Sequence, residues 1–181
     1  SAKTTYYSLT KLQQYLIVCF LSLSLRRNEI ATLKWSMMNQ EEKYIKVLWK
    51  GWKNKYIPLF DSIYSLLMEF SEKKKENWYD SPYIFSPLKK WWHIHNQKKH
   101  INTNYIFDMV KRLCVKNDID ESKITPHSFR TTFVKKALQK GLEYIEIMNS
   151  TGHSSMELIK YYDTRDTLKA NAINSMSDMF D

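Results

Sequence analysis

Apolar side chains recur every three or four residues over much of the chain, which is the spacing of one face of an α-helix. Asp61 is expected to cap one helix, the Thr125-Pro126 pair to begin another, and Gly141 to end it. The pattern predicts helices over residues 9–23, 26–35, 61–75, 102–113, 125–140 and 142–148, a short helix just before residue 162, and a last one over 167–180.

The spacing changes between residues 44 and 59. Residues 44–49 and 56–59 are rich in β-branched and aromatic side chains, and the polar segment 50–55 lies between them. This arrangement predicts a β-hairpin, with Pro58 at the end of its second strand, where a missing N–H costs least. Only 3 glycines and 4 prolines occur among 181 residues, which favours helices over a barrel of tight turns. We therefore predict a single, mainly α domain with a small β-hairpin or sheet, an α+β fold.

The chain carries 28 Lys and Arg against 19 Asp and Glu, a net charge of +9. This excess favours a polyanionic partner, with nucleic acid the first candidate and an acidic membrane surface the second. The apolar run over residues 15–25 is too short to span a bilayer. The two widely separated cysteines do not indicate a disulfide framework. Residues 89–100 are basic and aromatic, and Lys89 and Lys90 at their start are candidate DNA contacts.

The segment Thr125-Pro126-His127-Ser128-Phe129-Arg130 combines features that suit a phosphate. His127 and Arg130 are three residues apart, so on a helix they share one face. They would also lie near the N-terminus of that helix, where unpaired N–H groups favour an anion.

A second segment, Thr151-Gly152-His153, follows an apolar helix. Gly152 suits a left-handed turn that ends the helix, which would leave His153 at a helix junction. Tyr162 comes nine residues after His153 and directly follows Tyr161. Taken alone, the tyrosine pair has a packing explanation at least as good as a catalytic one.

The order and spacing of these residues resemble the tyrosine recombinase or phage integrase family. In the N-terminal half, Arg26 with Glu29 three positions on is similar to the family's first arginine motif, and this spacing selects Arg26 over Arg27. The segment 50–59 resembles the family's β-hairpin, whose catalytic lysine lies just before the turn. That match points to Lys50, with Lys53 and Lys55 as the alternatives if the register is wrong.

The resemblance implies a role for each matching residue. Arg26 and Arg130 would bind the negative oxygens of a phosphodiester, and Tyr162 would attack its phosphorus with help from His127 or His153. Lys50 would protonate the leaving 5′ oxygen, and Glu29 would orient a neighbour within the site. No metal or other cofactor is expected. The expected further DNA contacts are Arg27, Lys53, Lys55, Lys89 and Lys90.

The family resemblance also implies a fold and a biological setting. We expect the tyrosine recombinase catalytic-domain fold and site-specific recombination of double-stranded DNA through a 3′-phosphotyrosyl intermediate. The protein would be a monomer without DNA and a homotetramer on paired sites, in the cytoplasm and associated with the nucleoid. The chain would be the catalytic domain of a longer protein whose N-terminal core-binding domain it lacks, and residues 165–181 would dock on a neighbouring protomer.

Two other functions remain open from the sequence. The first is DNA relaxation like that of a type IB topoisomerase, and the second is DNA binding by a relative that has lost catalysis. The sequence departs from the family's usual pattern at Thr131, where many relatives have His, and at Thr151, where Leu is usual before Gly-His.

Overall fold

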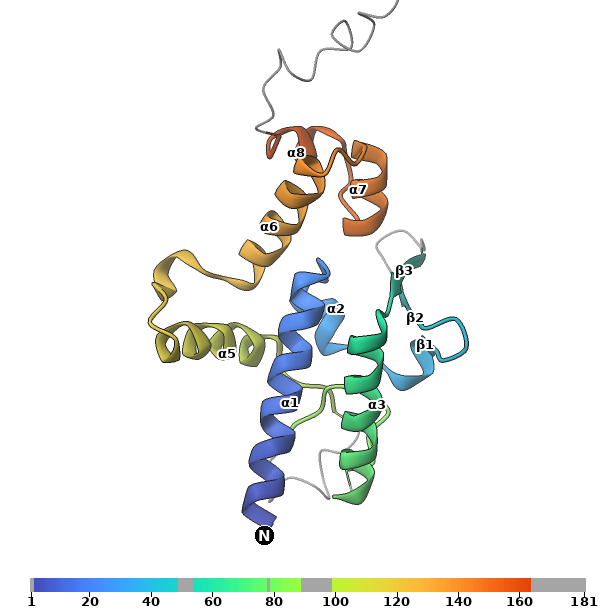
Figure 1. Ribbon diagram of the computed structural model, residues 1–181, viewed down its shortest axis with the longest axis vertical. Coiled ribbons are helices and arrows are strands. Elements are labelled where there is room, and N and C mark those ends of the chain that lie inside the picture. Colours follow the sequence, from blue (N-terminus) through green and yellow to red (C-terminus); the bar gives the residue numbers. More distant parts are fainter. Residues whose placement is uncertain (1, 49–53, 78, 89–98, 164–181) are drawn as a thin grey trace, which may run out of the picture. The chain divides into compact units, whose positions relative to one another are not determined.

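The computed structural model describes residues 2–48, 54–77, 79–88 and 99–163. The chain forms two compact units, residues 1–130 and residues 131–181, and the helix that begins at Pro126 carries residues of both. Helices and a small sheet make up the described chain (Figure 1), so the prediction of a mainly α fold with a small β-sheet is confirmed. The first unit contains α1 (Ala2–Ser22), α2 (Arg27–Ala31), a 3-10 turn (Trp35–Met37), β1 (Met38–Asn39), β2 (Tyr44–Leu48), β3 (Asn54–Pro58), α3 (Asp61–Glu76), α5 (Thr103–Lys116) and a second 3-10 turn (Glu121–Lys123).

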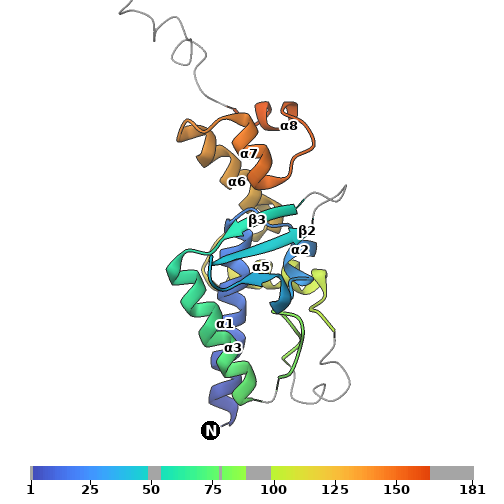
Figure 2. The same cartoon turned by 90° about the vertical axis from the view of Figure 1, so that its right-hand side faces the viewer.

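The core of the first unit lies where α1 and α3 run side by side, as both ribbon views show (Figures 1 and 2). Phe20 of α1 meets Phe85 edge to face with ring centroids 5.8 Å apart, and Phe70 of α3 meets the same ring at 6.2 Å. Such aromatic pairs bury large apolar areas and add specific contacts. Helix α5 buries Ile106 and Met109 in the same core.

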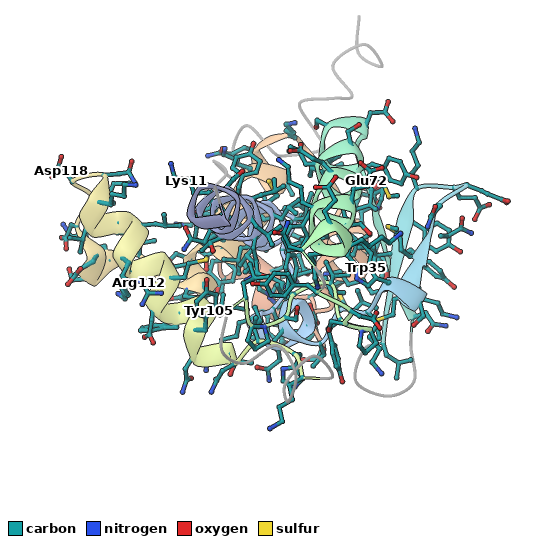
Figure 3. All side chains as sticks on the ribbon, turned by 90° about the horizontal axis from the view of Figure 1, so that it is seen from below. Lys11, Trp35, Glu72, Tyr105, Arg112 and Asp118 are labelled. Atoms are coloured by element: carbon teal, nitrogen blue, oxygen red, sulfur yellow. The ribbon has the colours of Figure 1, made fainter. Side chains whose placement is uncertain are left out.

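Helix α5 also holds a contact between a cation and an aromatic ring. Seen from below in Figure 3, Tyr105 and Arg112 lie along this helix, and the guanidinium carbon of Arg112 is 5.9 Å from the ring centroid of Tyr105. The predicted N-terminus of this helix is confirmed, because the Asn102 side chain accepts a hydrogen bond from the Asn104 N–H.

The sheet is antiparallel with strand order β1-β2-β3. Its hairpin was predicted, whereas the two-residue strand β1 was not. Ile45 pairs with Ile57 and Val47 pairs with Lys55, and all four of these side chains are buried. Because side chains alternate between the faces of a strand, this register places a lysine on the apolar face of the sheet.

The predicted helix over residues 26–35 is too long, because α2 ends at Ala31. Beyond it the chain extends and pairs with a distant segment: the Trp35 N–H donates to the Pro82 carbonyl, and the Ile84 N–H donates to the Leu33 carbonyl. The Trp35 N–H and the Leu33 carbonyl thus bond to this distant segment in place of continuing the helix.

Two other predicted helix starts are wrong. Asp61 is the first residue of α3 and not its cap, and its carboxylate pairs with Lys43 at 2.6 Å. The helix predicted from residue 142 is α7 (Tyr144–Thr151), which starts later because Glu146 accepts a hydrogen bond from the Glu143 N–H. This reciprocal arrangement at a helix start is a capping box.

The second unit contains the rest of α6 (Pro126–Gln139), then α7 and α8 (Glu157–Lys160). Gly141 ends α6 with φ +80° and Gly152 ends α7 with φ 69°, as predicted for both glycines. A small apolar core joins the three helices: Val134, Ala137, Leu138, Ile147 and Ile159. The predicted helix over 167–180 and the proposed docking segment 165–181 lie outside the described residues. In the part of the chain that is described, no helix has the length and apolar character needed to cross a membrane.

Candidate active site

Arg26 is held at the N-terminus of α2 by a carboxylate three residues further on. The Arg26 backbone N–H donates to Glu29 Oε2 at 2.8 Å, and its Nη1 donates to Glu29 Oε1 at 3.0 Å. The Glu29 side chain is 11% exposed and that of Arg26 is 41% exposed. A mostly buried carboxylate therefore fixes a guanidinium that still reaches solvent, which explains the three-residue spacing.

Arg130 lies near the start of α6 and is buried, with 4% of its surface exposed. Its Nη1 donates to the backbone carbonyl of Ser24 at 3.1 Å and lies 3.4 Å from the Ser24 hydroxyl oxygen. Ser24 occupies the turn between α1 and α2 with φ 71°, a conformation rare for a residue with a side chain. Sequence reasoning missed Ser24, because no local pattern predicts a left-handed backbone conformation for a serine.

Lys55 is buried next to these groups, with 4% of its surface exposed. Burial lowers the pKa of Lys55 to about 8; the Glu29 carboxylate opposes this shift, and the positive charges of Arg130 and Arg26 add to it. Its Nζ has no hydrogen-bond partner among the described residues. Three cations from α2, β3 and α6 thus gather around one carboxylate within residues 1–130.

His127 lies in the first turn of α6 with its side chain exposed. The turn is closed by Ser128, whose hydroxyl accepts a hydrogen bond from the Thr125 N–H at 3.1 Å while its own N–H donates to the Thr125 carbonyl at 3.0 Å. His127 and Arg130 are three residues apart on this helix but differ in burial, since His127 is exposed and Arg130 is buried.

The second unit fixes the tautomer of His153. The hydroxyl of Thr151 lies 2.6 Å from the Ile147 carbonyl oxygen and 2.7 Å from Nδ1 of His153. A carbonyl oxygen only accepts, so the single hydroxyl proton of Thr151 goes to Ile147. Nδ1 of His153 must then carry a proton and donate to Thr151, which leaves Nε2 of the neutral ring as a proton acceptor.

The two adjacent tyrosines differ in their surroundings. Tyr162 is half-buried and packs on the apolar core of residues 131–181, whereas Tyr161 is 85% exposed. Their rings meet edge to face with centroids 5.4 Å apart. Nearby, the Tyr144 hydroxyl donates to Asp163 at 2.6 Å and ties the segment after α8 to α7. These surroundings are compatible with either tyrosine as the nucleophile, and the choice of Tyr162 stays a prediction.

The remaining candidate residues fall in two groups. Lys50, Lys53, Lys89 and Lys90 lie outside the described residues. Arg27 is exposed as the first residue of α2. Among the described residues, no group of three or more His, Cys, Asp or Glu side chains is arranged to hold a metal ion.

Known proteins are similar in sequence to most of this chain. The family model described as the phage integrase family matches residues 2–168. The tyrosine recombinase XerA of Pyrococcus furiosus is 27% identical over 161 residues, which cover 88% of this chain and 52% of that protein. The tyrosine recombinase XerC of Erythrobacter litoralis is 24% identical over 149 residues, or 82% of this chain and 45% of that protein. The chain thus spans about half the length of these relatives.

Solved structures show the same fold. A crystal structure of XerA recombinase matches with a TM-score of 0.69 and 22% identity, over 97% of this chain and 62% of that one. The XerH site-specific recombinase, bound to its difH substrate in a pre-cleavage complex, matches with a TM-score of 0.71 and 20% identity, over 96% of this chain and 52% of that one. The match of the family model over nearly the whole length is decisive: this chain belongs to the phage integrase family.

Proposed function

We propose that this chain cuts and rejoins double-stranded DNA as the catalytic part of a site-specific tyrosine recombinase. The observation that carries the proposal is the convergence of Arg26, Lys55 and Arg130, from three separate elements, around one carboxylate. Concentrated positive charge of this kind suits a phosphodiester, whose oxygens gain negative charge in the transition state. Membership of the phage integrase family supports the same chemistry.

In the proposed cleavage step, the hydroxyl oxygen of Tyr162 attacks the scissile phosphorus. The new bond joins Tyr162 to the 3′ phosphate, and the bond from phosphorus to the 5′ oxygen breaks. The phenolic proton passes to a histidine, for which Nε2 of His153 is a suitable acceptor. The leaving 5′ oxygen takes a proton from Lys50.

Rejoining reverses these bond changes with the 5′ hydroxyl of a partner strand as the nucleophile. The phosphotyrosyl ester conserves the energy of the broken bond, so no ATP is needed. We further propose that four protomers act on two paired DNA sites, that the protein is monomeric without DNA, and that it works in the cytoplasm at the nucleoid. Arg27, Lys53, Lys89 and Lys90 would hold the DNA backbone outside the reacting phosphate.

The proposal is tested by trapping the covalent intermediate. The protein is mixed with a library of nicked duplexes of randomised sequence, and adducts that survive denaturation in detergent are recovered and sequenced. We expect attachment at the 3′ end, a free 5′ hydroxyl, and the same yield with excess EDTA, because the arginines supply the charge that a metal ion would otherwise provide. Attachment to a 5′ end, or no adduct over the whole library, would exclude this function.

A second expected result concerns Thr151. Replacing it by valine keeps its shape but removes the acceptor for Nδ1 of His153, so we expect cleavage to slow by roughly tenfold, a part of what a positioned base contributes. The ¹⁵N shifts of the His153 ring should move from the Nδ1–H tautomer toward the Nε2–H tautomer. Thr151→Ser, which keeps the hydroxyl, should retain both the tautomer and the rate. Identical ring spectra for Thr151→Val and the wild type would refute this assignment.

A further inference from the structure

Among the described residues of the first unit, two lysines are buried, and their surroundings differ. Lys74 of α3 is 2% exposed, and its ammonium donates to the carbonyls of Tyr83 and Ile84 and to the Ser86 hydroxyl, at 3.0–3.1 Å. Lys55 is 4% exposed, and its ammonium has no hydrogen-bond partner among the described residues. A buried ammonium without hydrogen bonds destabilises a fold, so the hydrogen bonds of Lys74 stabilise its ammonium whereas that of Lys55 stays unsatisfied among the described residues.

The charges around Lys55 indicate what would satisfy it. Glu29 is the carboxylate that acts on it, but Glu29 already accepts from the backbone and the guanidinium of Arg26. Arg26 and Arg130 add positive charge from the other elements that face Lys55. Three cations and one carboxylate leave an excess of positive charge at a place with little solvent. This excess of positive charge favours an anion as the partner of Lys55.

We propose that Lys55 is a phosphate-binding residue of this site, whose Nζ donates to a non-bridging oxygen of the scissile phosphate beside Arg26 and Arg130. The inference rests on the proposed function, because that function supplies the phosphodiester. The proposal gives Lys55 and Lys50 different roles: Lys55 would bind the phosphate, and Lys50 would protonate the leaving oxygen.

Lys55 is also the member of this cluster whose charge changes in the alkaline range. Burial lowers the pKa of Lys55 to about 8, so its ammonium loses its proton as the pH rises through that value. An anion binds the protonated form, so affinity should be highest below about pH 8 and should fall above it.

The test uses inorganic sulfate as the probe, since its charge is constant over this range. Sulfate affinity is measured by NMR titration from about pH 6.5 to about pH 10 at constant ionic strength. The wild type should bind more weakly above about pH 8. Lys55→Arg should bind sulfate with no such decline. Lys55→Met should bind sulfate roughly 10-fold to 100-fold more weakly, because one charge-assisted hydrogen bond is lost. Its sulfate affinity should not change with pH over this range.

The matched control is Lys46→Met, which removes the same charge from the exposed face of β2. It should bind sulfate as the wild type does. If Lys55→Met does not fold, the decline in the wild type and its absence in Lys55→Arg still decide the question. Equal sulfate affinity and equal pH profiles for the wild type and Lys55→Arg would overturn the proposal. This arm involves no DNA cleavage, so its result is independent of whether the adduct forms.

A second arm separates phosphate binding from proton donation. A substrate with sulfur in place of the bridging 5′ oxygen has a leaving group that needs no proton. We expect this substrate to restore cleavage by Lys50→Met but not by Lys55→Met. Restoration of Lys55→Met would make Lys55 the proton donor and would refute its assignment to the phosphate.

Discussion

Replacing Tyr162 by phenylalanine is expected to abolish the covalent DNA adduct, with a loss of at least roughly 10³-fold, because the attacking oxygen is removed and no other group replaces it. The change removes one oxygen from a half-buried ring that packs on the core of residues 131–181, so the fold should persist. Adduct yield on denaturing gels measures the first effect, and thermal unfolding measures the second.

Tyr161→Phe provides the matched control for this experiment. Tyr161 is 85% exposed, and its ring touches that of Tyr162, so the substitution changes the adjacent ring and leaves the apolar core intact. It should retain the adduct. If Tyr161→Phe loses the adduct while Tyr162→Phe keeps it, the nucleophile is Tyr161. The assignment of Tyr162 from its nine-residue spacing to His153 would then be wrong.

Replacing Arg130 by alanine is expected to slow cleavage by about 10²–10³-fold, the loss typical for one donor to a developing negative charge. The same change removes the donor to the buried Ser24 carbonyl, which should lower the free energy of unfolding by about 1–3 kcal/mol. Single-turnover cleavage and denaturant unfolding measure these two losses separately. Cleavage at the wild-type rate would exclude Arg130 from the site.

The Arg130→Lys variant separates charge from geometry. A lysine keeps the positive charge but cannot donate to Ser24 and to a phosphate from one planar group, so cleavage should remain impaired. Lys136→Ala, which removes a positive charge from the exposed part of the same helix, should change stability by less than about 0.5 kcal/mol. Full activity of Arg130→Lys would show that charge alone matters at this position.

Local patterns predicted much of this fold. Two runs of β-branched and aromatic residues indicated the hairpin. Gly141 and Gly152 indicated the ends of α6 and α7, because their left-handed backbones suit glycine. The spacing of Arg26 and Glu29 also predicted a contact that the structure contains. Both carboxylate oxygens of Glu29 accept hydrogen bonds from Arg26 across one helical turn. Features determined by neighbours in sequence were accessible to sequence reasoning.

Features determined by distant contacts were not. Helix α2 ends early because residues near Lys34 pair with residues near Tyr83. No pattern in the sequence near Lys34 predicts this pairing. The role of the left-handed turn at Ser24 depends on a distant residue, because the Ser24 carbonyl accepts a hydrogen bond from Arg130. Lys55 was also misplaced: it was predicted in the polar segment between the two strands, whereas the structure has it within β3, paired with Val47 and buried.

The most direct test is to locate the DNA on the protein. After the trapped adduct is digested with nuclease and trypsin, cleavage after Lys160 and Arg165 releases a peptide that holds both Tyr161 and Tyr162. Fragmentation in a mass spectrometer then assigns the attached nucleotide to one residue. We predict a 3′-phosphonucleotide on the oxygen of Tyr162; a nucleotide on Tyr161, or on any residue outside this peptide, would contradict the proposed mechanism.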